Sequence, residues 1–205
     1  MTLSTAVLAY LFAASLLTIT PGLDTALVVR TASIEGPRRG ALAALGIGCG
    51  CLAWGVAVAL GLGVLLAASN AAYALIKLAG AAYLVWLGIT LIVRPRTPLD
   101  LKGASTGGGN WWLRGLLNNL LNPKVGVFYV SFLPQFVPAG FSPAPFILLL
   151  AVIHFVMGLA WAGALILATA PIRRFLDDKG AVRWLDRVTG GVFVTFGVGL
   201  ALDRR

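Results

Sequence analysis

The stretch TITPGLDTALVVR, Thr18–Arg30, decides how this chain folds. It ends an apolar run that begins at Met1, and it places a Pro-Gly pair and one aspartate where the pattern predicts a buried helix. Proline removes a backbone donor and clashes with the preceding turn, and an ionised carboxylate in hydrocarbon costs roughly 2.5–3.5 kcal/mol on insertion scales. We therefore expect a helix that breaks at Pro21 and Gly22, with Asp24 beside the break.

The composition around this stretch is that of an integral membrane protein. Of the 205 residues, 59% are hydrophobic and 11% are charged, and the mean hydropathy is +0.92. Soluble domains have about 25% charged residues. A net charge of +9 would suggest nucleic-acid binding in a soluble protein. Here the basic residues lie in short loops between apolar runs, so we expect a lipid bilayer as the partner and no nucleic acid.

The apolar runs predict an all-α bundle, because a helix of about 20 apolar residues crosses a bilayer core. Six helical segments are expected, at about 3–30, 40–67, 70–93, 111–137, 143–170 and 182–202. They divide into a first three-helix unit, 1–100, a hydrophilic cytoplasmic linker, 101–110, and a second unit, 111–205. A five-span variant remains open if the first or last segment is re-entrant.

Basic residues alternate between successive connections. The first, third and fifth connections carry them, whereas the second, near 68–70, and the fourth, 134–145, carry none. By the positive-inside rule the basic connections face the cytoplasm, which puts both termini outside. Arg204 and Arg205 would then lie on the less usual side, which argues modestly against the sixth span.

The fourth segment contains the same kind of interruption as the first. It reads NNLLNPKVGVFYVSF, Asn118–Phe132, and again a proline and a charge interrupt an apolar helix. Asn122 and Pro123 have the residue types of an N-cap and a first helical position, and Lys124 follows. Three spans separate the two breaks, so the halves would have opposite orientations, as in transporters built from inverted repeats with discontinuous helices.

Asp24 and Lys124 are the ionisable residues that the breaks place inside the membrane, where such groups are functional by default. The alternative to a functional role for Asp24 is a structural one. In it the helix merely kinks, Thr20 is the N-cap, Pro21 takes the first helical position, and the carboxylate complements the helix dipole. For Lys124 a nearby helix N-terminus is unfavourable, so a negative partner is expected. A rise of about 1.5 Å per residue puts Asp24 roughly 9 Å and Lys124 roughly 15 Å from the inner interface. A lysine side chain can span that difference, so the two could pair directly or through a substrate.

Other polar residues in the apolar runs are weaker candidates. His154 is either a packed, hydrogen-bonded histidine or a member of a proton relay. Cys49 and Cys51 are expected to be small buried hydrophobes. Asn118 and Asn119 are expected simply to bond between helices.

Two motifs in this order, TPGLDTALVVRTASIEGPRRGALAALGIGCG (Thr20–Gly50) and GLLNNLLNPKVGVFYVSFLPQF (Gly115–Phe136), resemble those of the lysine-exporter (LysE/RhtB) family. Length and hydropathy agree over essentially the whole chain. The resemblance implies export of amino acids or close derivatives across the bacterial inner membrane, driven by ion or proton gradients. By residue it points to Pro21, Gly22, Asp24, Asn122, Pro123 and Lys124. Two departures are Leu23, where a proline is common, and Trp54, where many members carry a histidine.

These observations predict a secondary exporter of zwitterionic small molecules, with neutral amino acids slightly preferred because no further acid accompanies Asp24. The half-helix N-termini would offer N–H groups to the substrate carboxylate, and Asp24 would face its ammonium or carry the coupling proton. A membrane channel and a structural membrane scaffold are the rivals, and homo-oligomer formation stays open. An enzyme is not expected, because an aspartyl dyad needs two buried acids and a His-Glu-x-x-His zinc site needs two histidines, whereas the chain has one. We expect no cofactor and no metal.

Overall fold

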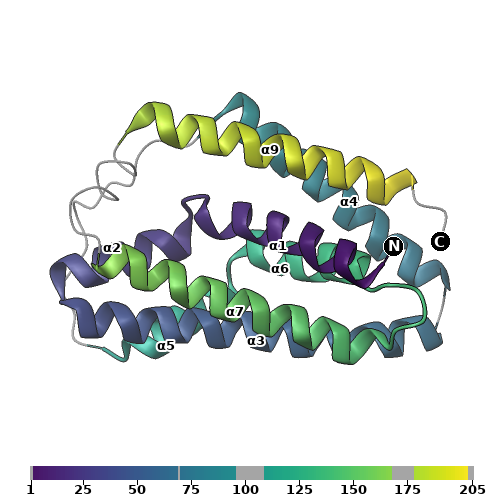
Figure 1. Ribbon diagram of the computed structural model, residues 1–205, viewed down its shortest axis with the longest axis horizontal. Coiled ribbons are helices and arrows are strands. Elements are labelled where there is room, and N and C mark those ends of the chain that lie inside the picture. The colour runs from purple at the N-terminus through teal and green to yellow at the C-terminus, as the bar shows by residue number, and fades with distance from the viewer. Residues whose placement is uncertain (1, 69, 96–108, 168–177, 203–205) are drawn as a thin grey trace.

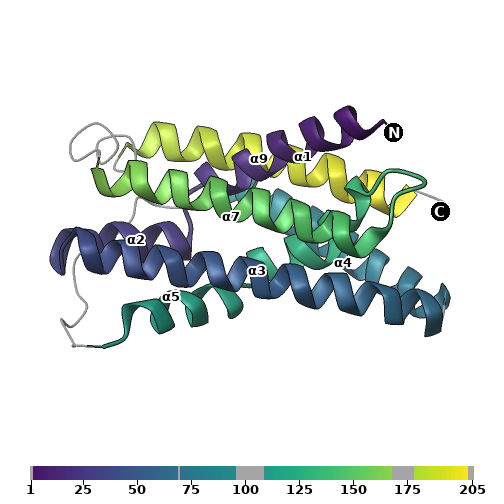
Figure 2. The same cartoon turned by 60° about the horizontal axis from the view of Figure 1, so that its bottom comes forward.

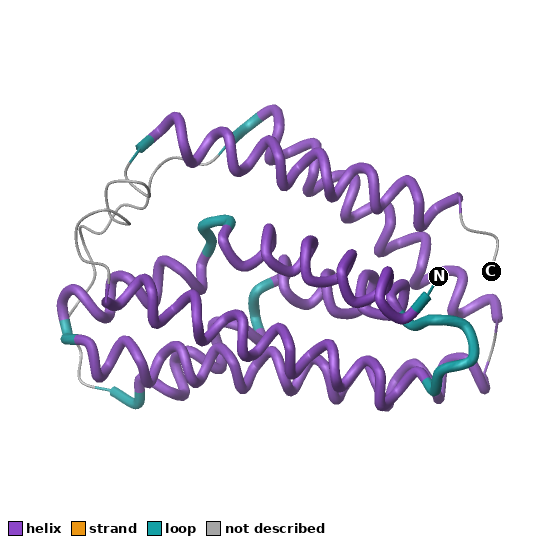
Figure 3. Tube along the Cα trace, in the orientation of Figure 1, coloured by secondary structure: helices purple, strands orange, loops and turns teal. Residues whose placement is uncertain are grey.

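The described residues fold almost entirely into helices (Figures 1 and 3). The computed structural model describes residues 2–68, 70–95, 109–167 and 178–202. Along this part of the chain the elements are α1 Leu3–Ile19, α2 Leu23–Ile34, α3 Pro37–Ala68, α4 Asn70–Val93, α5 Trp111–Leu120, α6 Pro123–Val127, a π-helical turn η1 Phe128–Phe132, a 3₁₀ turn η2 Leu133–Phe136, α7 Pro143–Leu167 and α9 Lys179–Leu202.

These elements match the six predicted segments. The first segment is α1 with α2, the second is α3, the third is α4, the fourth runs from α5 to η2, and the fifth and sixth are α7 and α9. The prediction of an all-helical fold is confirmed for the described residues. Most of the predicted linker, 101–108, and the end of the fifth segment, 168–170, lie outside them.

The first helix breaks where the sequence predicts. α1 ends before Pro21, and α2 starts at Leu23 at an angle of 52° to it. The alternative in which Thr20 caps α2 is wrong, because Gly22, in an extended conformation, is the N-cap and Thr20 ends α1. The Thr20 hydroxyl is engaged elsewhere: it lies 2.6 Å from the Thr189 hydroxyl of α9, and both side chains are buried.

The second break also has the predicted form. Asn122 is the N-cap of α6, its Oδ1 accepts from the Lys124 backbone N–H at 3.1 Å, and Pro123 occupies the first turn. The helix then widens into η1 and tightens into η2. Such π-helical turns are rare and are frequently found at functional sites.

The helices form two groups (Figures 1 and 2). α4 packs along α9, and α3 packs along α2, α5 and α7, with α1 between the two groups. Figure 1 shows the first turn of α1 and the last turn of α9 at one end. The α2–α3 turn, the last turns of α4 and α7 and the first turns of α5 and α9 lie at the other end. The helix ends that flank the three basic connections therefore gather at one end of the bundle.

Two described helices are by themselves long and apolar enough to cross a membrane, namely the stretches Pro37–Gly61 and Pro143–Leu167. The bent pair α1 and α2 qualifies as a third, and Leu78–Val93 is a shorter apolar helix. Large apolar side chains are also exposed on these helices, among them Phe12, Trp86 and Val156, which are between 57% and 59% exposed. The full set of six spans stays a prediction.

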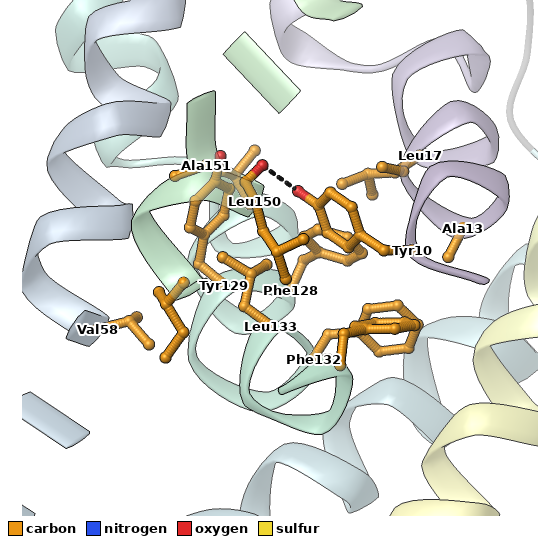
Figure 4. Packing of buried hydrophobic residues seen from close by; sticks show 14 of the residues in the cluster. Tyr10, Ala13, Leu17, Val58, Phe128, Tyr129, Phe132, Leu133, Leu150 and Ala151 are labelled. Carbon is orange, nitrogen blue, oxygen red and sulfur yellow. Dashed lines mark hydrogen bonds between the residues drawn. The ribbon is translucent and has the colours of Figure 1, made fainter. Parts of the chain in front are cut away.

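The buried core lies around η1 and η2 (Figure 4). Phe128, Tyr129 and Phe132 are completely buried, and the Phe128 ring packs against the rings of Tyr129, Phe132 and Tyr10. The Tyr10 hydroxyl donates to the Leu150 carbonyl at 2.8 Å (Figure 4), so its only polar atom has a partner inside the cluster. This aromatic cluster joins α1, η1 and α7.

Candidate functional site: a cavity at the two helix breaks

A cavity of about 90 Å³ lies where the two breaks meet α3 and α7. Its polar wall includes Asp24 from the start of α2 and Lys124 from the start of α6. Its other walls are largely apolar, with Ile47 of α3 and Phe155 of α7 among them. The cavity is thus formed by both halves of the chain.

Lys124 is held by the C-terminal end of α1. In an unbroken helix the backbone N–H of residue 21 would donate to the Leu17 carbonyl. Because Pro21 has no N–H, that carbonyl is left open, and the Lys124 ammonium donates to it at 3.2 Å. The ammonium also donates to the Thr20 carbonyl at 3.3 Å. Lysine is favourable at the negative end of a helix dipole, so the expected negative partner of Lys124 includes these carbonyl groups.

The carboxylate of Asp24 is held by two neighbouring amides on α5. Asn118 Nδ2 donates to Oδ1 at 2.6 Å, and Asn119 Nδ2 donates to Oδ2 at 2.9 Å. Asn119 is completely buried and its Nδ2 also lies 3.5 Å from Cys51 Sγ. These contacts tie the start of α2 to the last turn of α5.

The structure brings most of the predicted site residues together. Gly22, Asp24, Asn122, Lys124 and His154 all line the one cavity. The two remaining residues act on the backbone, because Pro21 and Pro123 set the positions of the two breaks.

His154 is buried and hydrogen-bonded, and it also faces the cavity. Its Nδ1 lies 2.9 Å from the Tyr129 hydroxyl, and its ring stacks near Phe128. These contacts are those of the packed, hydrogen-bonded histidine, and the proton relay stays a prediction. The Tyr129 contact connects the cavity to the aromatic cluster.

Trp54, the departure from the resembled motif, does not line this cavity. It lines a second, more open hollow of about 620 Å³ between α3, α4 and the fourth segment. A Cβ on Gly126 would lie 2.8 Å from Trp54 Cζ2, so the indole packs directly on α6. Asn122 borders both hollows.

Sequence reasoning missed two features of the site. Asn118 and Asn119 were expected only to join helices, and no local signal identifies their partner. Trp161 lines the cavity, and its indole N–H is buried without a hydrogen-bond partner among the described residues. Away from the cavity lining, Asp186 lies inside α9 with a fully buried side chain.

The cavity combines two opposite charges with an apolar lining. One carboxylate and one ammonium lie on a mostly apolar surface at the ends of broken helices. Discontinuous helices in membrane proteins provide such sites because their ends carry backbone groups without helical partners.

Comparisons with known proteins identify the family of the chain. Residues 15–204 match the model of the LysE type translocator family. A homoserine/homoserine lactone efflux protein of Salmonella typhimurium is 32% identical over 96% of each chain. A threonine efflux protein of Escherichia coli K12 is 29% identical over 91% of this chain and 92% of its own. A Bacillus subtilis membrane protein, YrhP, is 29% identical over 96% of this chain and 98% of its own.

No solved structure matches the chain. The family match covers nearly the whole sequence, including both helix breaks, and these relatives cover more than nine tenths of the chain. The chain is therefore a bacterial membrane protein and a transporter, not an enzyme, and it belongs to the LysE type translocator family.

Proposed function

We propose that this protein is a proton-coupled exporter that moves small neutral amino acids out of the cytoplasm. One observation carries the proposal: Asp24 and Lys124 face a single cavity at the junction of two broken helices. An amino acid brings one ammonium and one carboxylate, and these groups complement the two charged side chains. The start of α2 at Leu23 adds backbone N–H groups near the substrate carboxylate.

The preference for neutral substrates follows from charge balance in the cavity. Asp24 and Lys124 are the charged residues among its described lining. A substrate with a second ammonium would need a further acid, since a buried charge without a partner is strongly unfavourable. The names of the two relatives, which refer to homoserine and threonine efflux, support small uncharged side chains.

The position of the cavity supports loading from the cytoplasm. On α7 the cavity residues run from His154 to Leu165, towards the end where the basic connections gather. The buried α7 residues from Phe146 to Ala151 belong instead to the hydrophobic core that surrounds the aromatic cluster. The aromatic cluster thus lies between the cavity and the opposite end. With the basic end in the cytoplasm, both termini lie outside and this conformation faces inward.

We assign the coupling proton to His154 and the substrate ammonium to Asp24. Histidine is the side chain whose charge changes nearest to neutral pH. His154 lies between the cavity and Tyr129 of the aromatic cluster, so a change in its charge would act on the packing that closes the outer side. A separate variant tests each role: Asp24→Asn tests the binding of the substrate ammonium, and His154→Gln tests the coupling proton.

The helix contacts support an inverted repeat of 1–100 and 111–205. α1 packs on α7, and α5 packs on α3, so the first half of each broken segment contacts the second span of the other half. In the same sense α4 pairs with α9, the third span with the sixth. Two repeats related by an axis in the membrane plane would produce these pairings.

The test is efflux of radiolabelled threonine, homoserine, valine and lysine from proteoliposomes, with and without an imposed pH gradient. We expect export of the neutral amino acids that increases with the gradient, and little export of lysine. Asp24→Asn should abolish export while the protein remains inserted. His154→Gln should retain export down a substrate gradient but lose the response to pH.

Glu35→Gln is the matched control, because Glu35 lies at the α2–α3 turn, paired with Arg39 and away from the cavity. It should export at the wild-type rate. A saturable flux whose rate does not change with any imposed ion gradient would favour a channel or facilitator. Absence of flux for all four amino acids would refute the proposal and favour a scaffold or another substrate class.

A further inference from the structure

We infer that Asn118 and Asn119 are positioning residues that orient the carboxylate of Asp24 and so complete a subsite for a primary ammonium group. The inference rests on the proposed function, since it names the part of the cavity that would take the ammonium of the substrate. Its basis is the pair of side-chain contacts across 94 and 95 residues of sequence, 2.6 Å from Asn118 and 2.9 Å from Asn119.

The two amides occupy different oxygens of the carboxylate. An ionised carboxylate has about four acceptor positions. The Asn122 side chain also interacts with this carboxylate, so at least one position remains after the three amides have donated. Asp24 lines the cavity, and an ammonium group, with three donors and no acceptor, complements the positions that remain. Because amides are neutral, they fix the carboxylate in place without cancelling its charge.

The orientation of the Asn119 amide is itself determined by its surroundings. Its Nδ2 lies between Asp24 Oδ2 and Cys51 Sγ, both of which accept hydrogen bonds. The reversed amide would bring its oxygen against the carboxylate, which is repulsive. Asn119 Oδ1 points towards α3, where a Cβ on Gly50 would lie 2.6 Å from it. Glycine at position 50 therefore leaves room for the amide.

A purely structural role would also give these contacts, with the asparagines serving only to join α5 to α2. The two roles differ in their consequence for ligands. If the pair only joins helices, its loss weakens every ligand of the cavity alike. If the pair orients Asp24 for an ammonium, its loss weakens amines selectively and leaves carboxylates unaffected, because the carboxylate of the substrate would bind elsewhere in the cavity.

The experiment uses Asn118, which is half-buried and so tolerates change better than the fully buried Asn119. Asn118→Leu keeps a similar volume and removes the donor, and Asn118→Gln keeps an amide on a longer side chain. Asn110→Ala is the matched control, because Asn110 caps the other end of the same helix. Half-inhibitory concentrations of propylamine and butanoate are measured against efflux of labelled threonine from proteoliposomes.

We expect Asn118→Leu to raise the half-inhibitory concentration of propylamine about tenfold, as for the loss of one hydrogen bond to a charged group, and to leave that of butanoate unchanged. Asn118→Gln should return propylamine to within about threefold of wild type. Asn110→Ala should shift neither inhibitor. An equal shift of both inhibitors in Asn118→Leu, or a wild type that propylamine does not inhibit, would overturn the inference.

Failure of the proposed function gives a different result. If the wild type exports no amino acid, propylamine binding is followed instead by the melting temperature of the purified protein. Stabilisation of the wild type that is lost in Asn118→Leu and restored in Asn118→Gln would support the ammonium subsite without amino-acid export. Equal stabilisation of the wild type and Asn118→Leu, or none of either, would overturn it.

Discussion

Lys124 is the residue at which the reasoning about the two breaks can be tested most directly. Its ammonium donates to the carbonyls of Leu17 and Thr20 at 3.2 and 3.3 Å. Lys124→Met keeps the length and apolar bulk of the side chain but removes both donors. The Leu17 carbonyl cannot recover a helical donor from the chain, because Pro21 has no N–H.

The size of the effect follows from these two contacts. A hydrogen bond from a charged donor contributes about 1.5–3 kcal/mol, so the two together contribute about 3–6 kcal/mol. The carbonyls border a cavity that water can enter, so we expect the lower end, about 3 kcal/mol. For a chain of 150–250 residues, 1 kcal/mol shifts the melting temperature by about 2–4 °C. The expected loss is therefore about 6–12 °C.

The assay is thermal unfolding of purified protein in detergent. A second substitution tests whether the Leu17 carbonyl is the group that loses its donor. Pro21→Ala supplies the missing N–H, so it should recover about 1 kcal/mol in the Lys124→Met background and not in the wild type. Arg114→Met is the control, because Arg114 stacks on Trp111 outside the cavity and should cost less than about 1 kcal/mol.

A melting temperature for Lys124→Met within about 2 °C of wild type would refute the view that Lys124 caps α1. Equal effects of Pro21→Ala in both backgrounds would show that the Leu17 carbonyl is not the group that Lys124 satisfies.

Three further predictions concern packing, the histidine and topology. Gly115→Ala should destabilise by about 1–3 kcal/mol, because a Cβ there would overlap the Ala43 backbone of α3. Gly163→Ala, with nothing within 4 Å, should be neutral or stabilising in the same melting assay, and equal effects would contradict this. Tyr129→Phe should cost about 1–3 kcal/mol in thermal unfolding by leaving His154 Nδ1 unpaired in the core, whereas an unchanged melting temperature would mean that water takes the place of the hydroxyl. A reporter fused to the C-terminus should be active outside the cytoplasmic membrane, and activity confined to the cytoplasm would reverse the topology.

The sequence by itself determines where the helices break. Pro21 and Pro123 act through their own ring and their missing N–H, which are local effects, and both breaks lie where the sequence predicts them. Helix ends are less certain, since α2 runs on to Ile34 instead of ending near residue 30, and α3 begins at Pro37. Gly36 makes that turn with φ +95, a conformation that favours glycine.

The sequence also identifies Asp24 and Lys124 as candidates, because a charge in an apolar run is rare enough to stand out. It does not determine what they contact. Their hydrogen-bond partners lie 94 to 107 residues away, and an amide or a carbonyl group can pair with many partners. Only the tertiary structure decides these contacts. The docking of α5 against α2 and α3 brings Asn118 and Asn119 to Asp24, and the docking of α6 against the end of α1 brings Lys124 to the Leu17 carbonyl that Pro21 leaves without a donor.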